Sequence, residues 1–195
     1  MGLDMYLNKM PRYKKVTGEQ VSAIEYYFDW LREKESGGQY ANCTFKEWCG
    51  CDLSELPDAE TIEHFRQFYK VSFSNWDVEK QYPWYRIHEQ VGYWRKANQI
   101  HNWFVEHVQN GVDDCRYHNE VTKEDLEELL DTCHEVLCNP DLADELLPTQ
   151  GGFFFGSTEY DEYYIQDLEC TINTITKVLE TTDFDKEMLY YVSSW

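Results

Sequence analysis

The sequence predicts an α+β fold that is mainly α-helical, with four to five helices and a small sheet that contains the N- and C-terminal strands. Apolar residues recur at helical spacing within 21–31, 89–110, 126–137 and 168–179. Both ends of the chain instead resemble strands: the start alternates apolar and polar residues, and the end is rich in Tyr and Val. The length of 195 residues suits a single domain, 1–195.

The N-terminal elements are predicted from their boundary residues. Pro11 ends the first strand, because proline lacks the N–H that a sheet needs. Thr17 and Gln20 have the spacing of a capping box, so a helix should follow them. Gly37-Gly38 should end that helix. Residues 37–57 show no periodic pattern and are expected to form an irregular, insertion-like region.

Two further helices are predicted before the middle of the chain. Asp58 can cap a short helix. Residues 71–86 are rich in aromatic side chains and read as a packed loop or a short strand. A longer helix is expected from about Glu89 to Asn110, with Gly111 as the residue that follows its C-terminus.

The C-terminal part of the chain should contain two helices and a strand between them. Thr122 and Asp125 can cap one helix, and Asn139-Pro140 should end it. Phe153–Phe155 is a short apolar run compatible with a buried strand. The helical pattern of 168–179 completes the set, before the strand-like Met188–Trp195.

Composition excludes several classes of function. The chain carries 37 acidic and 17 basic residues, a net charge of −20, which excludes direct binding of nucleic acid through a basic surface. No apolar run approaches the roughly 18 residues that span a membrane, so we expect no membrane partner. The start of the sequence lacks the pattern of a signal peptide. These features predict a soluble cytoplasmic protein.

The seven cysteines are expected to be free thiols. An odd number of cysteines without a signal peptide is typical of a reducing compartment. Cys115, His118, Cys133 and Cys138 are the first set to test as zinc ligands, but Cys133 occupies a core-facing position of its helix, where cysteine acts as a small apolar residue. We therefore expect neither a metal nor another cofactor.

The first segment with chemical character is Tyr93–Val105. In a continuous helix His101 falls in the middle of the apolar face, with Asn98 beside it and Arg95 one turn earlier, whereas Trp103 lies on the opposite face and is expected to be exposed. A buried His and Asn need hydrogen-bond partners, so the set can be a structural network. It can alternatively be a ligand site that offers a cation, an amide and an imidazole.

The second segment runs from Gly151 to Tyr164. Ser157 or Thr158 can cap the helix that follows, and the acidic side chains of Glu159 and Asp161 suit its positive end. The segment contains neither a Walker A motif nor a dinucleotide-binding motif.

Because buried polar groups need partners, we expect the two segments to pack against each other. Arg95 should then pair with Glu159 or Asp161. The candidate binding residues are Arg95, Asn98, His101, Ser157, Glu159 and Asp161.

Several stretches together resemble an uncharacterised protein family that is encoded widely in bacteriophages and prophages. They are MGLDMYL at the start, YWRKAN followed by IH and WFV, GVDDC, LLPTQ, the segment Phe153–Asp161, and the ending YY…SW. The resemblance spans most of the chain, though residues 37–57 match nothing in it. It implies a phage context and a cytoplasmic product, and it brings no known activity.

Three classes of function remain. In the first, the chain binds and inhibits a host factor such as a defence nuclease, using its acidic surface to imitate the phosphate backbone of DNA and to occupy a basic groove. In the second, it binds a small, nucleotide-like ligand between the 93–105 helix and the 156–161 turn. In the third, it is an enzyme in which His101 and Glu159 or Asp161 form an acid–base pair, which we favour less. The sequence leaves the oligomeric state open.

Overall fold

The computed structural model describes residues 2–13, 16–73, 83–115 and 118–195. The α+β fold with a predominance of helix is confirmed. The described residues form seven α-helices, two short 3-10 helices and six strands, which is more helices than expected. The two additional helices are α2 (Phe45–Cys49) and α6 (Ala143–Leu146). Each is too short for a periodic apolar pattern to reveal it.

The chain divides into two compact units. The first consists of Met1–Arg12 together with Gln90–Trp195 and is called the terminal unit here, because it contains both ends of the chain. The second, Tyr13–Glu89, is called the inserted unit.

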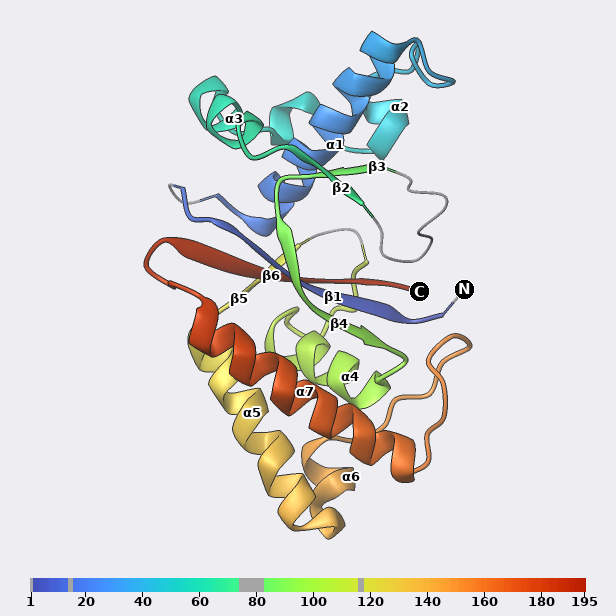
Figure 1. Cartoon of the computed structure of the whole chain (residues 1–195). Helices are drawn as coiled ribbons and strands as arrows, with labels where there is room; N and C mark the ends of the chain where they lie inside the picture. The colour runs from blue at the N-terminus through green and yellow to red at the C-terminus, as the bar shows by residue number, and fades with distance from the viewer. Residues whose placement is uncertain (1, 14–15, 74–82, 116–117) are drawn as a thin grey trace. The chain divides into compact units, whose positions relative to one another are not determined.

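The terminal unit is built on a four-stranded sheet with the strand order β4-β1-β6-β5 (Figure 1). Strand β1 (Asp4–Pro11) pairs antiparallel with β6 (Glu187–Ser194) over its whole length. The expected pairing of the two terminal strands is therefore confirmed. Strand β5 (Asn119–Val121) adds to the other side of β6, and β4 (Glu89–Arg95) forms the opposite edge.

Four helices lie on one side of this sheet (Figure 1). They are α4 (Asn98–His107), α5 (Lys123–Cys138), α6 and α7 (Glu162–Thr181). The predicted cap of α5 is confirmed, because Thr122 and Asp125 form a full capping box. This helix ends, as expected, immediately before Asn139-Pro140.

The core of the terminal unit lies between the sheet and these helices. Leu3, Met5 and Leu7 of the N-terminal segment are fully buried in it, and Cys133 reaches it from α5, as predicted. Helix α7 comes close to β4 because Gly92 has no side chain: a Cβ there would lie 3.1 Å from Thr174 and from Leu7. A side chain at that position would require these neighbours to shift by a few tenths of an ångström.

The predicted helix from Glu89 to Asn110 is wrong in its first half, which forms strand β4. The chain turns sharply at Lys96, whose φ of 63° is unusual for a residue other than glycine. The Lys96 N–H donates to the Leu3 carbonyl at 2.8 Å, which fixes this turn against the first strand. The expected exposure of Trp103 is also wrong: it is 3% exposed and stacks on His107, because α4 is buried on more than one face.

The expected strand at Phe153–Phe155 is a turn instead. Its three phenylalanines point to different environments: Phe153 is 95% exposed, whereas Phe155 is buried. A Cβ at Gly152 would lie 2.8 Å from the Phe155 ring, and Gly156 has a φ of +94°. The glycines on both sides therefore serve a tight turn and not a strand.

The inserted unit is mostly helical, and its predicted caps are confirmed. Thr17 and Gln20 form the capping box of α1 (Gly18–Ser36), which Gly37 ends in a left-handed conformation. Asp58 caps α3 (Ala59–Arg66). The region expected to be irregular contains α2 and the short 3-10 helix Leu53–Glu55.

The aromatic segment of the inserted unit is partly described. The backbone of β2 (Lys70–Phe73) pairs antiparallel with that of β3 (Pro83–Arg86), so the alternative of a short strand is confirmed there. The rest of the predicted segment, 74–82, lies outside the described residues.

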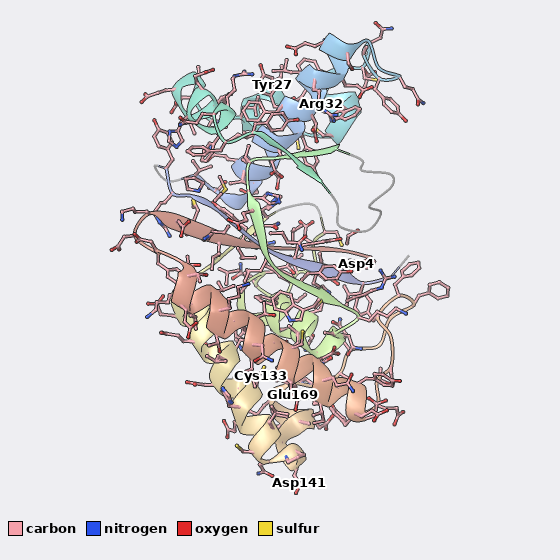
Figure 2. The ribbon with its side chains drawn as sticks, in the orientation of Figure 1. Asp4, Tyr27, Arg32, Cys133, Asp141 and Glu169 are labelled. Carbon is pink, nitrogen blue, oxygen red and sulfur yellow. The ribbon has the colours of Figure 1, made fainter. Side chains whose placement is uncertain are left out.

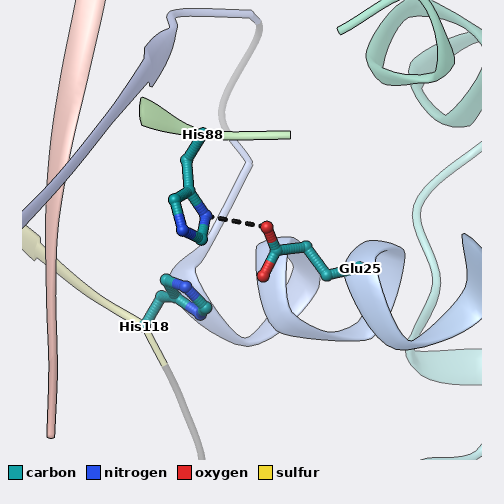
Figure 3. Close-up of side chains that lie close together, drawn as sticks. All are labelled: Glu25, His88 and His118. Carbon is teal, nitrogen blue, oxygen red and sulfur yellow. Dashed lines mark ion pairs between the residues drawn. The ribbon is translucent and has the colours of Figure 1, made fainter. Parts of the chain in front are cut away.

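The inserted unit also contains a buried acid. Glu25 of α1 accepts a hydrogen bond from the Ile87 N–H and lies 2.7 Å from Nδ1 of His88 (Figure 3). This acid thereby connects α1 to the end of the unit.

In the parts of the chain that the structure describes, none of the helices combines the length and the apolarity needed to cross a bilayer.

Candidate functional site

The side chain of Asn98 joins the start of α4 to the turn at Phe153–Asp161. Its Nδ2 donates to the carbonyls of Phe155 and Ser157 at 3.1 and 2.7 Å, and its Oδ1 accepts from the Gln150 N–H at 2.8 Å. The residue is 2% exposed. The expected packing of the two segments is thus present: the N–H groups of the amide bind main-chain carbonyls after Phe153, and its oxygen binds the main chain before Phe153.

His101 is fully buried one turn later, between two partners that the sequence did not indicate. Its Nδ1 lies 2.7 Å from the Tyr191 hydroxyl and its Nε2 lies 3.1 Å from Oδ2 of Asp113. Burial lowers the pKa of His101, and the hydrogen bond and charge of Asp113 oppose that shift. Because a carboxylate only accepts, Nε2 carries the proton and donates to Asp113, and the Tyr191 hydroxyl donates to Nδ1.

The same network reaches the last residue of the sequence. Oδ1 of Asp113 accepts from the Trp195 indole N–H at 3.2 Å, and the Trp195 ring packs on Phe155. His101 also meets the Phe155 ring edge to face. Asp113, His101 and Trp195 therefore hold the turn and the C-terminal strand together. The acid–base pairing of His101 with Glu159 or Asp161 is wrong, since its ring nitrogens face Tyr191 and Asp113.

Arg95 points to a different place from the one expected. It ends β4, and its Nη1 pairs with Oδ1 of Asp4 at 3.2 Å, the atom that also accepts from the Tyr93 hydroxyl. The predicted ion pair of Arg95 with Glu159 or Asp161 is therefore wrong. The strand that replaces the first half of the predicted helix moves Arg95 off the face that carries Asn98.

The three predicted residues of the turn also have separate roles. Asp161 caps α7 by accepting from the N–H groups of Tyr163 and Tyr164. The predicted cap at Ser157 or Thr158 is wrong by a few residues, because α7 begins only at Glu162. The Ser157 hydroxyl accepts from the Glu159 N–H within the turn, and the Glu159 side chain is exposed.

The possible zinc ligands occupy dissimilar environments. Cys133 is buried in the core, and burial raises its pKa to about 12. Cys138 is exposed, and the thiol of Cys115 lies 3.7 Å from the Ser193 hydroxyl. The His118 ring packs edge-on against Tyr190. None of the seven cysteines, all of which lie in the described residues, forms a disulfide bond in the structure.

The most distinctive surface of the terminal unit is acidic. The segment 123–181, which contains α5, α6, α7 and the turn before α7, carries 15 acidic residues and two lysines. We call this segment the acidic layer. Figure 2 labels Asp141 and Glu169, which lie at two places on it. Twelve of its acidic side chains are exposed: Glu124, Glu127, Glu128, Asp131, Glu135, Asp141, Asp144, Glu145, Glu159, Glu162, Glu169 and Glu180.

Few cations compensate these charges. Within the residues that the structure describes, Glu127 is the one exposed acid of the layer with a lysine partner, Lys123 at 2.8 Å. The His107 ring lies 3.9 Å from Glu128. The terminal unit as a whole has 23 acidic and 8 basic residues, a net charge of −15, whereas the inserted unit has 14 and 9, a net charge of −5. The negative charge of the chain is therefore concentrated in the terminal unit.

One acidic residue that sequence reasoning missed lies on the inner side of α7. Asp167 accepts from the Gln99 amide at 3.2 Å, and burial raises its pKa to about 6. Its position three residues after Tyr164 and one before Leu168, both buried, could have indicated partial burial. Asp113 and Tyr191 gave no comparable signal, because their contacts with His101 depend on the tertiary fold.

Comparison of the chain with protein-family models, with curated protein sequences and with solved structures gave no match.

Proposed function

We propose that the terminal unit is a protein-binding module whose acidic layer occupies the basic groove of a partner protein, in the place of a nucleic-acid backbone. One observation carries the proposal: twelve exposed carboxylates and two lysines on one helical segment. Such a surface attracts a cationic groove over a long range and speeds its association. The resemblance to phage-encoded proteins makes a host defence nuclease the first class of partner to test.

The polar cluster of Asn98 and His101 supports this choice indirectly. Both N–H groups of the Asn98 amide and both ring nitrogens of His101 are engaged inside the unit. A small ligand at this place would have to displace those bonds, each of which is costly to leave unmade when buried. Among the described residues, most of the twelve exposed carboxylates have no such internal partner and can meet a partner protein; the exceptions are Glu127, Glu128 and Asp144.

The test combines capture with competition. The protein is immobilised on a support and exposed to a bacterial lysate, and the bound proteins that elute with salt are identified. The partner found in this way is then purified and bound to a short duplex DNA. We expect the chain to displace that DNA, and the competition to weaken steeply as the salt concentration rises, because several charges are involved.

A pair of charge-matched variants locates the binding surface. One carries Asp131→Asn, Glu135→Gln, Glu145→Gln and Glu169→Gln in the acidic layer. The other carries Glu33→Gln, Glu35→Gln, Glu63→Gln and Glu89→Gln in the inserted unit. Both reduce the negative net charge from −20 to −16. We expect only the first variant to compete about tenfold or more weakly, since local charge determines binding to a groove. Equal loss in both variants, or no displacement of DNA by the wild type, contradicts the proposal.

A further inference from the structure

Exposed aromatic side chains are concentrated at one part of the terminal unit. The large apolar side chains that are exposed among the described residues include Phe153 at 95%, Tyr160 at 44%, Tyr163 at 65% and Trp195 at 48%. Three of these four lie within eleven residues of sequence, and the fourth packs on Phe155 of the same turn. Single exposed apolar residues are ordinary, but a group of aromatic residues is typical of an interface.

The turn that carries Phe153 is held firmly on both sides. Asn98 binds the main chain before and after it, at Gln150, Phe155 and Ser157. The carbonyl of Phe154 accepts from the Leu3 N–H at 3.1 Å, which ties the turn to the N-terminal segment. Because the backbone is fixed before a partner arrives, little conformational entropy is lost when the Phe153 ring is bound.

The charges around these rings are mostly negative. The Tyr160 hydroxyl donates to Asp144, and the Trp195 indole N–H donates to Asp113. Glu159 is exposed in the same turn. The cations nearby are Lys96, whose side chain packs near Gly156, and Arg95, which lies beside Gly2 and pairs with Asp4.

This combination selects the kind of partner. A second copy of the chain would bring its own acidic surface, and an anionic membrane or a nucleic acid would be repelled in the same way. A protein with cationic residues around an apolar pocket complements both the carboxylates and the ring.

We propose that Phe153 is the apolar anchor of the interface, inserting into a pocket at the edge of the partner's basic groove. This inference rests on the proposed function and adds the residue that gives the interaction its specificity. Buried aromatic anchors surrounded by polar contacts typically dominate the binding energy of an interface. The carboxylates of the acidic layer then guide the approach, and the ring determines how long the complex lasts.

The test uses the basic partner protein that salt elutes from the immobilised chain, in purified form. Its affinity is measured for the wild type, for Phe153→Ala and for Tyr40→Ala, which removes an exposed aromatic of the inserted unit as a matched control. We expect Phe153→Ala to weaken binding about 30-fold, mainly through faster dissociation, and Tyr40→Ala to change it less than about twofold. Phe153→Leu should restore part of the affinity.

The salt dependence separates this inference from the proposed function. Phe153→Ala should leave the slope of affinity against salt unchanged, whereas the acidic-layer variant should reduce it. If the acidic-layer variant loses binding and Phe153→Ala does not, the anchor is wrong and the proposed function stands. If no partner is captured, or neither variant changes binding, both are wrong. A dimer of the wild type in light scattering that Phe153→Ala abolishes would also overturn the anchor, because the patch would then bind a second copy.

Discussion

The first turn of α4 and the acidic layer are both rich in polar side chains, but they use them in opposite ways. At the start of α4, Asn98 and His101 are buried and bound to other groups of the terminal unit. In the acidic layer, twelve carboxylates face solvent, with one lysine partner among the described residues. A polar residue on an apolar face therefore marks architecture in this chain, whereas the proposed binding of a partner uses polar groups that face solvent.

The largest expected effect on stability comes from Asn98, at the start of α4. Asn98→Ala strands two carbonyls and one N–H group, so we expect the free energy of unfolding to fall by about 3 kcal/mol. Urea titration followed by circular dichroism measures this. Asn173→Ala, at an exposed position of α7, should stay within about 0.5 kcal/mol of the wild type. A small effect at Asn98 would mean that the turn does not depend on its amide.

His101 should give a smaller loss that depends on pH. His101→Ala removes the partner of Tyr191 and Asp113 and should cost about 2 kcal/mol at pH 7.5. Burial keeps the pKa of His101 below its usual 6.5, so the unfolded chain takes up a proton first as the pH falls. The stability that the neutral ring contributes is thus present above pH 6.5 and lost below it.

Unfolding in urea at pH 7.5 and pH 5.5 checks the sign. The gap between the wild type and His101→Ala should narrow at the lower pH. A gap that widens would show that the folded protein holds the charged ring more tightly than the unfolded chain does.

Asp167 should respond in the opposite direction. Burial raises its pKa to about 6 from a usual value of 3.8, so ionisation of the folded protein above that pH is unfavourable. Stability linked to this group is highest below pH 3.8 and is lost as the pH rises through 6. Asp167→Asn should therefore stabilise the protein by about 1 kcal/mol at pH 7.5, a figure reduced for partial exposure.

The gain should disappear at pH 4, and thermal unfolding at both pH values measures it. Glu169→Gln on the exposed side of the same helix serves as the control and should change little at either pH. A destabilised Asp167→Asn at pH 7.5 would show that the hydrogen bond from Gln99 outweighs the cost of burial.

The smallest effect on stability should come from the acidic layer. The fourfold variant of the acidic layer removes exposed charges and should change the free energy of unfolding by less than about 0.5 kcal/mol at physiological salt. The same variant is expected to lose partner binding while it keeps its stability. Asn98→Ala, in contrast, is expected to lose stability. A large loss of stability would show that these carboxylates stabilise the fold.

Local chemistry made much of the fold predictable. The caps at Thr17, Asp58 and Thr122 involve side chains that bind N–H groups within three residues, so spacing alone indicates them. The strand-to-helix break at Lys96 has no such local signal, because a lysine, and not a glycine or an asparagine, occupies the left-handed position. The residues on both sides of Lys96 also follow the spacing of a helix, so the sequence pattern does not show the break.

The candidate site was predictable only where a buried polar residue needed a partner. That requirement placed Asn98 against the turn correctly, but it could not choose which acid Arg95 would meet. The choice depended on Arg95 belonging to β4 beside Asp4, a tertiary fact. The exposure of Phe153 was missed because three consecutive phenylalanines suggest burial, although a turn can present only some of them to the core.

The strand order of the terminal unit also affects when the sheet can form during synthesis on the ribosome. Strand β1 pairs with β6, which is translated about 175 residues later, whereas the inserted unit is one continuous stretch between them. At about 5 to 20 residues per second, β1 waits roughly 10 to 35 seconds for β6. Until β6 emerges, β1 can pair only with its other neighbour, β4, so the apolar side chains of Leu3, Met5 and Leu7 face an incomplete sheet, and the nascent chain at this stage offers apolar surface to chaperones.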